Sequence, residues 1–214
     1  AKINYQEQRE QMVKEQLIVR GIDDDAVLEA FRTIPREKFV PKERREDAYR
    51  DGPLPIGEGQ TISQPYIVAT MLQALKPESG DKLLEIGTGS GYAAAVMSRI
   101  VNKVHGVERN DELANKAEER LSTLGCDNVA LHVGDGTKGW PQAAPYDGII
   151  VSAAAPEIPE ALVDQLVAGG YLVLPAGHKH VQKLYQVQKL ETGEINKNKL
   201  GRVRFVPLVG EDGW

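Results

Sequence analysis

Residues 83–92 have the sequence LLEIGTGSGY, and residues 93–97 continue it as AAAVM. An apolar run that breaks into three glycines at alternate positions and then becomes rich in alanine predicts a strand, a tight turn and a helix. Glycine suits positions where the backbone takes a positive φ or lies against a ligand, and the start of the following helix offers free N–H groups. The stretch therefore predicts a nucleotide-cofactor loop in an α/β fold with a mostly parallel, doubly wound sheet.

The spacing of glycines and acids around this loop distinguishes between cofactors. A second apolar run ends in Glu108, 17 residues after Gly91, about where an acid that binds ribose hydroxyls stands in doubly wound folds. A dinucleotide fingerprint requires Gly-x-Gly-x-x-Gly, whereas here Tyr92 takes the position after the third glycine. The loop therefore argues against an NAD-linked oxidoreductase and resembles the first motif of S-adenosylmethionine-dependent methyltransferases. A tight turn without a ligand is the structural alternative.

Length, composition and charge restrict the class of protein. The 214 residues, 41% of them hydrophobic and 27% charged, suit one globular domain with a substantial core. The N-terminal segment is too polar for a signal peptide and the single cysteine, Cys126, excludes an intrachain disulfide, so we expect a cytoplasmic protein. No apolar run is long enough to span a bilayer, and the net charge of −5 makes nucleic acid a poor partner. We expect a monomer that binds neither nucleic acid nor membranes.

The order of patterns divides this single domain into three parts. Residues 1–64 are expected to form N-terminal helices that pack over the cofactor mouth, and then a substrate loop from Pro41 to Gln64, in which residues 51–60 are expected to lack regular structure. Residues 65–177 alternate strand and helix patterns as a cofactor-binding βαβ core, and residues 178–214 predict a closing β-hairpin. The expected helices cover about residues 7–20, 26–35, 66–75, 93–97, 112–124 and 162–167, and the expected strands about 83–86, 103–107, 129–133, 148–152, 171–175, 184–189 and 202–208.

Residues outside the glycine loop suggest little other chemistry. Asp135 follows the third core strand, at the sheet edge where such folds bind ligands, and could accept a hydrogen bond from an adenine amino group; a turn role is the alternative. The segment Ser152 to Pro156 lacks the Asn or Asp, prolines and aromatic with which methyltransferases bind the amino groups of bases. His178 and His180 have no third ligand of suitable spacing, so we expect an exposed strand entrance and no metal.

A carboxylate acceptor fits a chain without a recognisable catalytic-base motif. With a pKa of about 4, such an acceptor is already a nucleophile at neutral pH and needs no general base. The methyl donor would be a sulfonium cation, so a pocket need only exclude water and align the reacting atoms. Orientation alone can supply up to about 7–11 kcal/mol.

Five segments, which cover nearly the whole chain in order, resemble the protein-L-isoaspartate O-methyltransferase family. Thr-Ile-Ser-x-Pro, upstream of the glycine loop, is more particular than the loop itself, which identifies only the superfamily. The resemblance implies methylation of the α-carboxylate of L-isoaspartyl residues in aged or unfolded proteins, with S-adenosylmethionine as donor, S-adenosylhomocysteine as product and no metal. The ester would then collapse to a succinimide, which hydrolyses partly to aspartyl. The five segments are Pro35–Pro41, Gly59–Pro65, Leu83–Tyr92, Gly134–Gly136 and Val203–Leu208.

The same resemblance assigns roles to individual residues. Ser63 matches the family's active-site serine, and a hydroxyl cap on the helix after Pro65 is the alternative role for both Thr61 and Ser63. Residues expected to bind the substrate are Thr61, Ile62, Gln64, Val206, Pro207 and Leu208. Residues expected to bind the cofactor are Glu85, Gly87, Thr88, Gly89, Gly91, Glu108 at the ribose, Asp135 and Gly136 at the adenine, and Val209. Two competing functions stay open: another carboxyl methyltransferase, and a non-catalytic adenosylmethionine-binding module.

Overall fold

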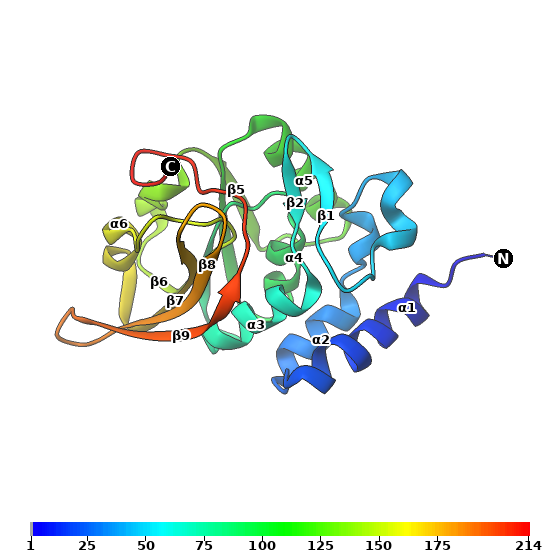
Figure 1. The fold of residues 1–214 in the computed structure, drawn as a ribbon, viewed down its shortest axis with the longest axis horizontal. Helices are drawn as coiled ribbons and strands as arrows, with labels where there is room; N and C mark the ends of the chain where they lie inside the picture. Colours follow the sequence, from blue (N-terminus) through cyan, green and yellow to red (C-terminus); the bar gives the residue numbers. More distant parts are fainter. Residues whose placement is uncertain (1) are drawn as a thin grey trace.

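A seven-stranded sheet forms the centre of the molecule in the computed structural model, which describes residues 2–214 (Figure 1). Its strand order is β5-β4-β3-β6-β7-β8-β9; the first five strands are parallel, and β8 and β9 continue the sheet antiparallel. The predicted α/β fold with a mostly parallel sheet and a C-terminal hairpin is confirmed. The strands are β3 Lys82–Ile86, β4 Lys103–Glu108, β5 Val129–Val133, β6 Tyr146–Val151, β7 Leu166–Gly177, β8 Gln182–Lys189 and β9 Ile195–Val203.

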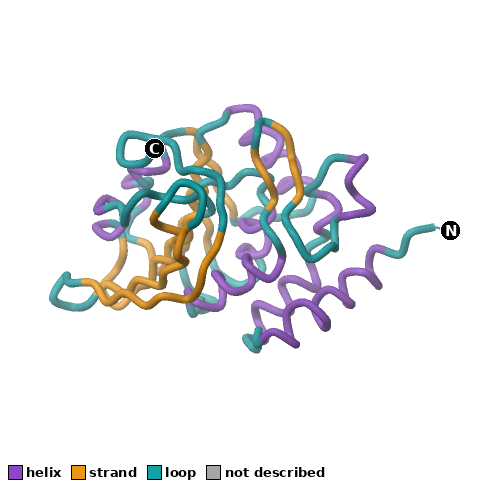
Figure 2. Tube along the Cα trace, in the orientation of Figure 1, coloured by secondary structure: helices purple, strands orange, loops and turns teal. Residues whose placement is uncertain are grey.

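Helices cover the two faces of this sheet unequally. One face buries Leu83 and Leu184 against α3, α4, α5 and the N-terminal helices. The other face buries Leu84 and Leu172 beneath the short helix α6 and the turns near Trp140. In Figure 2 the N-terminal helices lie at the end of the molecule away from the β8–β9 hairpin. The helices are α1 Tyr5–Met12, α2 Asp25–Thr33, α3 Pro65–Leu75, α4 Tyr92–Ser98, α5 Asp111–Thr123 and α6 Glu160–Asp164.

The N-terminal helices pack against α3 and α4, so the prediction that they cover the cofactor mouth is wrong. Helix α1 continues in further helical turns over residues 13–20 and ends at Gly21, where φ is +93°. In α2, Phe31 is fully buried and packs edge-on against Tyr92 of α4, with ring centroids 6.1 Å apart. Their apolar faces are buried there, and no residue of α1 or α2 lines the ligand cavity at the carboxyl end of the sheet. Within the described chain, no helix is long and apolar enough to cross a membrane.

Residues 41–64 are more regular than predicted. A 3₁₀ turn at Lys42–Asp47 precedes a two-stranded antiparallel hairpin, formed by β1 Leu54–Gly57 and β2 Gln60–Ile62. The hairpin turn uses Gly57 and Gly59, whose φ angles are +95° and +67°. The expectation of an irregular loop is wrong because the prolines and glycines mark this turn, while the apolar residues between them alternate into the core.

Two expected elements near the C-terminus are displaced. Helix α6 ends at Asp164 rather than near residue 167, because Leu166 already pairs with Tyr146 of the neighbouring strand. Strand β9 lies earlier than predicted, and the expected strand at 202–208 leaves the sheet after Val203.

The segment that follows β9 is extended but pairs with a loop. Ala154, just after β6, donates its backbone N–H to the carbonyl of Val206 at 2.7 Å, and Leu208 donates its N–H to the carbonyl of Ala154 at 2.8 Å. The alternating pattern of this segment therefore predicts its extended backbone correctly. The pattern does not identify the part of the chain with which the segment pairs. This pairing places the segment at the carboxyl end of the parallel strands.

Candidate functional site

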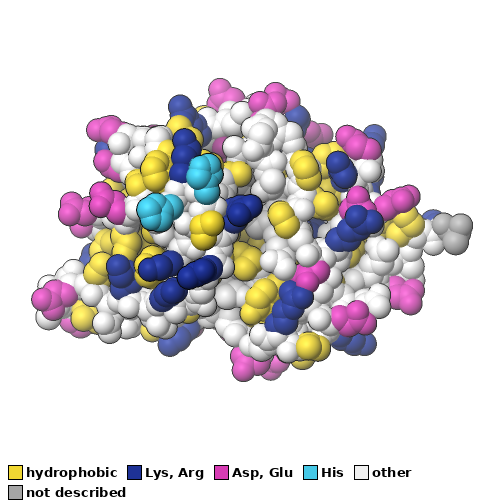
Figure 3. All heavy atoms as spheres, in the orientation of Figure 1, with side chains coloured by type: hydrophobic (Ala, Val, Ile, Leu, Met, Phe, Trp, Pro, Cys, Tyr) yellow, Lys and Arg dark blue, Asp and Glu magenta, His cyan; other side chains and the backbone are white. Residues whose placement is uncertain are grey.

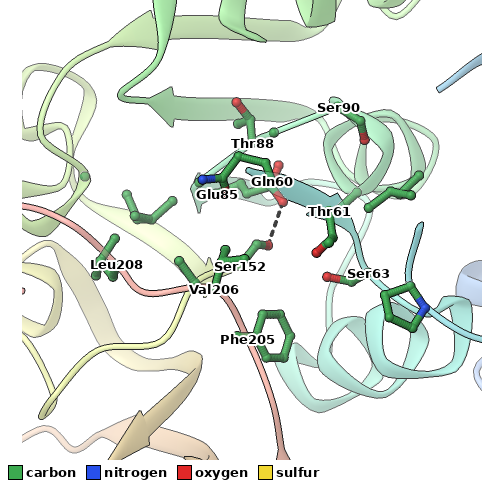
Figure 4. A pocket seen from close by; sticks show the side chains of 18 of the residues that line it. Gln60, Thr61, Ser63, Glu85, Thr88, Ser90, Ser152, Phe205, Val206 and Leu208 are labelled. Atoms are coloured by element: carbon green, nitrogen blue, oxygen red, sulfur yellow. Dashed lines mark hydrogen bonds between the residues drawn. The ribbon is translucent and has the colours of Figure 1, made fainter. Parts of the chain in front are cut away.

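A cavity of about 680 Å³ opens at the carboxyl end of the parallel strands. This is the edge at which open α/β sheets bind ligands. Its walls include the strip at residues 60–64, the glycine loop, the ends of β3, β4 and β6, and the segment that follows β9. Figure 4 shows Thr61 and Ser63 of the strip lying across the cavity from Val206 and Leu208.

The glycine loop has the conformation that its sequence predicts. Gly87, Gly89 and Gly91 have φ angles of +80°, +51° and +87°, which L side chains rarely adopt. Gly87 and Gly89 line the cavity, whereas Gly91 does not. A Cβ on Gly91 would lie 3.1 Å from the Cβ of Ala117 in α5, so this glycine allows close packing of the turn against that helix.

Glu108, at the end of β4, binds the glycine loop directly. Its carboxylate accepts hydrogen bonds from the backbone N–H groups of Gly89, at 2.8 Å, and Asn110, at 3.0 Å. The side chain is largely buried yet lines the cavity. Each carboxylate oxygen can accept a further bond, so Glu108 keeps acceptor capacity for hydroxyl groups of a ligand.

Glu85, at the end of β3, is a buried carboxyl group at the cavity wall. It is 1% exposed, and its Oε2 accepts a hydrogen bond of 2.9 Å from the hydroxyl of Ser152 (Figure 4). Its Oε1 has no hydrogen-bond partner among residues 2–214. Burial raises the pKa of Glu85 to about 8, and the charge of Glu108 adds to the increase. A cationic ligand group would satisfy this oxygen and favour the ionised form.

The hydroxyl groups of the strip are not used to cap helix α3. Its N-cap residue is Gln64, and no side chain bonds to the first turn. Within the described chain neither Ser63 nor Thr61 makes a side-chain hydrogen bond that would hold its hydroxyl away from the cavity. The capping alternative for Ser63 is therefore wrong, and its hydroxyl is free to bind a ligand.

The structure brings all but two of the predicted site residues to the cavity. Gly91 is one exception, and Asp135 is the other. The Oδ1 of Asp135 accepts bonds from the N–H and hydroxyl of Thr137, at 2.9 and 2.7 Å, and its Oδ2 accepts from the N–H of Glu211, at 2.9 Å. The carboxylate is thus bound to the C-terminal tail. The residues that line the cavity as expected are Thr61, Ile62, Ser63, Gln64, Glu85, Gly87, Thr88, Gly89, Glu108, Gly136, Val206, Pro207, Leu208 and Val209.

Sequence reasoning missed several residues of the cavity wall. Ser152 is the only hydrogen-bond donor to the carboxyl group of Glu85 among the described residues, and its position at the end of a predicted strand was the signal that could have identified it. Phe205 and the arginines at 202 and 204 belong to the segment whose path the sequence did not predict. His178 and His180 lie exposed in the turn before β8, and the described residues contain no group of three or more potential metal ligands.

Comparisons with known proteins agree on one family. The family model described as Protein-L-isoaspartate(D-aspartate) O-methyltransferase (PCMT) matches residues 7–213. A protein-L-isoaspartate O-methyltransferase of Pelotomaculum thermopropionicum is 58% identical over 207 residues, covering 97% of this chain and 90% of the relative. Protein-L-isoaspartate O-methyltransferase 2 of Pelobacter propionicus is 56% identical over 212 residues, covering 99% and 94%.

Solved structures show the same relationship in three dimensions. A structure named protein-L-isoaspartate O-methyltransferase has a TM-score of 0.85 at 32% identity; the match covers 95% of this chain and 66% of that one. A Plasmodium falciparum protein, solved in complex with S-adenosyl-L-homocysteine, has a TM-score of 0.80 at 29% identity, with 97% and 99% covered.

Proposed function

The chain belongs to the protein-L-isoaspartate O-methyltransferase family, and from this premise we propose how its cavity carries out the reaction. The protein transfers a methyl group from S-adenosylmethionine to the α-carboxylate of L-isoaspartyl residues in damaged proteins. A backbone amide nitrogen then attacks the ester carbonyl and expels methanol to close a succinimide, whose hydrolysis restores part of the normal aspartyl linkage. The observation that supports this most directly is one cavity with two buried carboxyl groups on one wall and two free hydroxyls on another.

The carboxyl wall suits the cofactor. Glu85 offers an unpartnered buried oxygen to the ammonium of the methionyl part, and Glu108 offers acceptors to the ribose hydroxyls. Gly87 and Gly89 let the backbone approach the ligand. Gly136 packs closely against Ile86, because a Cβ at position 136 would lie only 2.5 Å from the Cγ2 of Ile86. When bound, S-adenosylmethionine supplies an electrophilic methyl group on a sulfonium. The residues require no metal for this chemistry.

The hydroxyl wall suits the acceptor. Ser63 donates a hydrogen bond to the substrate carboxylate and fixes its direction of attack, while the neighbouring Thr61 supports the same geometry. Because a carboxylate is ionised at neutral pH, no residue has to remove a proton. Ile62 and Val206 supply apolar surface that excludes water from the reacting atoms.

The cavity also supports selection of isoaspartyl over aspartyl residues. An isoaspartyl residue holds its α-carboxylate on a short branch of the main chain, so the site must contact peptide backbone as well as the carboxylate. The strip at 60–64 and the segment 206–208 form opposite walls along which an extended peptide can lie. We therefore propose flexible or unfolded polypeptides as substrates. We also propose that the enzyme is a monomer.

We further propose that the protein works in the cytoplasm. Its single cysteine, Cys126, is buried and free, as suits a reducing compartment. Fractionation of native cells should recover the protein with cytoplasmic markers, and recovery with an extracellular fraction would contradict this location.

The decisive experiment is transfer of radiolabelled methyl from S-adenosylmethionine to two peptides that differ only in an isoaspartyl or aspartyl linkage. We expect label on the isoaspartyl peptide alone. Equal labelling of both would favour a different carboxyl methyltransferase. Cofactor binding without transfer to either peptide would favour a non-catalytic binding module.

A further inference from the structure

The β8–β9 hairpin concentrates positive charge in a chain whose net charge is −5. Residues 182–204 contain six lysines and arginines but only two glutamates, which lie in and beside the hairpin turn. Figure 3 shows lysine and arginine side chains gathered over this part of the molecule. We call the side chains of Lys183, Lys197, Lys199 and Arg202 the basic face.

Strand register places these four residues on one side of the hairpin. Lys183 pairs with Arg202, and on the same side of β8 Tyr185 pairs with Lys199. Directly opposite residues of antiparallel strands point to the same face of a sheet. The ammonium of Lys197 lies 4.8 Å from the ring centroid of Tyr185, which confirms that it shares this side.

The charges of the basic face are exposed, and no acidic side chain among residues 2–214 forms an ion pair with them. All four side chains are exposed. The ion pairs among residues 2–214 lie elsewhere, for example between Lys138 and Asp212 at 3.0 Å. Like charges held close together on neighbouring strands are unfavourable unless a negative partner lies between them. This arrangement is therefore complementary to an anionic partner.

The basic face is continuous with the substrate cavity. Arg202 belongs to the basic face and also lines the cavity, and Arg204 lines the cavity two residues further on. An extended chain rises about 3.4 Å per residue, so the stretch from Arg202 to Lys197 matches about six residues of an extended peptide. A peptide whose reacting carboxylate occupies the cavity can thus lay its flanking residues along the hairpin.

We propose that the basic face binds acidic segments that flank the isoaspartyl residue of a polypeptide substrate. The inference rests on the proposed function, because it presumes that a peptide occupies the cavity. A polypeptide fits better than nucleic acid, since the negative charge of the rest of the chain repels a long polyanion. Clustered charges of this kind act on encounter and affinity rather than on chemistry, and salt screens them.

The test compares two isoaspartyl peptides that differ only in three flanking residues, Glu in one and Gln in the other. For the unmodified enzyme at about 0.02 M salt we expect a KM roughly five- to tenfold lower for the Glu peptide, with similar kcat, and less than about a twofold difference at 0.5 M salt. Fluorescence anisotropy of the labelled peptides, without cofactor, should show the same preference.

The variant Lys183→Gln/Lys197→Gln/Lys199→Gln should lose the preference yet methylate the Gln peptide as before. It leaves Arg202 and Arg204 in place because they line the cavity. A matched control, Lys14→Gln/Lys38→Gln/Lys42→Gln, removes the same charge from exposed positions on the N-terminal elements and should keep the preference.

Several outcomes overturn the inference. Equal KM values for the two peptides, or equal loss of preference in the control variant, would leave no role for the basic face. Tighter binding of an RNA oligomer than of the Glu peptide at the same salt would assign the face to nucleic acid. Failure to methylate even the Gln peptide would instead contradict the proposed function itself.

Discussion

The carboxylate of Glu108 accepts a 2.8 Å hydrogen bond from the backbone N–H of Gly89, and so joins the end of β4 to the glycine loop that follows β3. A second bond, from the N–H of Asn110, fixes the other carboxylate oxygen. The residue expected to bind the ribose therefore also holds the loop that would cradle the rest of the cofactor. Its two roles make it the most sensitive point of the cofactor wall.

Replacing Glu108 by alanine should weaken S-adenosylmethionine binding by about 1.5–3 kcal/mol, the range for hydrogen bonds to a charged group. Isothermal titration calorimetry measures this loss. Glu108→Gln keeps one oxygen acceptor and should lose less. Unchanged affinity in a folded Glu108→Ala protein would contradict the assignment, and tight NAD binding by the unmodified chain would favour an oxidoreductase.

The cofactor affinity should increase with pH because of Glu85. Its pKa of about 8 leaves it largely protonated at pH 7, whereas a bound ammonium favours the carboxylate. Binding therefore releases protons at neutral pH, and affinity increases until Glu85 is ionised in the free protein. Titrations at pH 7 in two buffers of different ionisation enthalpy count the protons released.

Glu85→Gln is the matched variant for this prediction, since it keeps the shape of the side chain but cannot ionise. It should bind the cofactor more weakly, and the proton release should disappear. Ser152→Ala, which removes the donor to Glu85, should shift the rise in affinity to higher pH. If the heat of cofactor binding to the unmodified protein is the same in both buffers, Glu85 keeps its protonation state on binding.

Sequence predicts the parts of this site that are local in the chain. The φ angles of Gly87 and Gly89 follow from the glycine spacing, and Glu108 follows from the length of one βα unit. The Glu85–Ser152 pair was not predicted because its members are 67 positions apart and meet only when β3 pairs with β6. A sequence pattern can predict where a strand ends, but it does not predict which side chain from a distant part of the chain will lie beside that end.

The fate of Asp135 illustrates the same limit. Asp135 follows β5 at the ligand-binding edge, as predicted. Its carboxylate, however, accepts a hydrogen bond from the backbone N–H of Glu211 in the C-terminal tail. The direction of that tail depends on the exit of the chain from β9, which the sequence pattern placed too late.

Asp135→Ala should consequently destabilise the protein by about 1–3 kcal/mol, through loss of a turn cap and of the bond to the tail. The tail should become susceptible to limited proteolysis, and Trp214, whose indole N–H donates to the carbonyl of Ala154 at 2.9 Å, should change its fluorescence. Asp212→Asn, at an exposed ion pair, is the control and should change stability little. Loss of cofactor affinity as large as that of Glu108→Ala, with the tail intact, would restore Asp135 to the cofactor site.

Substrate accessibility provides a fourth prediction. Because the two walls of the cavity must both contact an extended peptide, an isoaspartyl residue held in a folded protein should be methylated much more slowly than the same residue after unfolding. The comparison uses two forms of one isoaspartyl protein. One form is native, and the other is reduced or truncated so that it cannot fold. Equal initial rates of methylation for the two forms would mean that the site recognises the carboxylate without contacting the peptide backbone.

The final prediction separates positioning by Ser63 from nucleophilic catalysis. The acceptor carboxylate is ionised at neutral pH, so a serine nucleophile would add a step that the chemistry does not need. Ser63→Ala should therefore lower turnover roughly 10- to 100-fold, as expected for one lost alignment bond of about 1–3 kcal/mol, and leave cofactor affinity nearly unchanged. Thr61→Val, which removes the neighbouring hydroxyl at similar volume, should have a smaller effect. Single-turnover kinetics and mass spectrometry of the enzyme decide the question. A methylated Ser63 in the unmodified protein would show that the hydroxyl itself carries the methyl group, and complete loss of activity in Ser63→Ala would contradict a role in positioning alone.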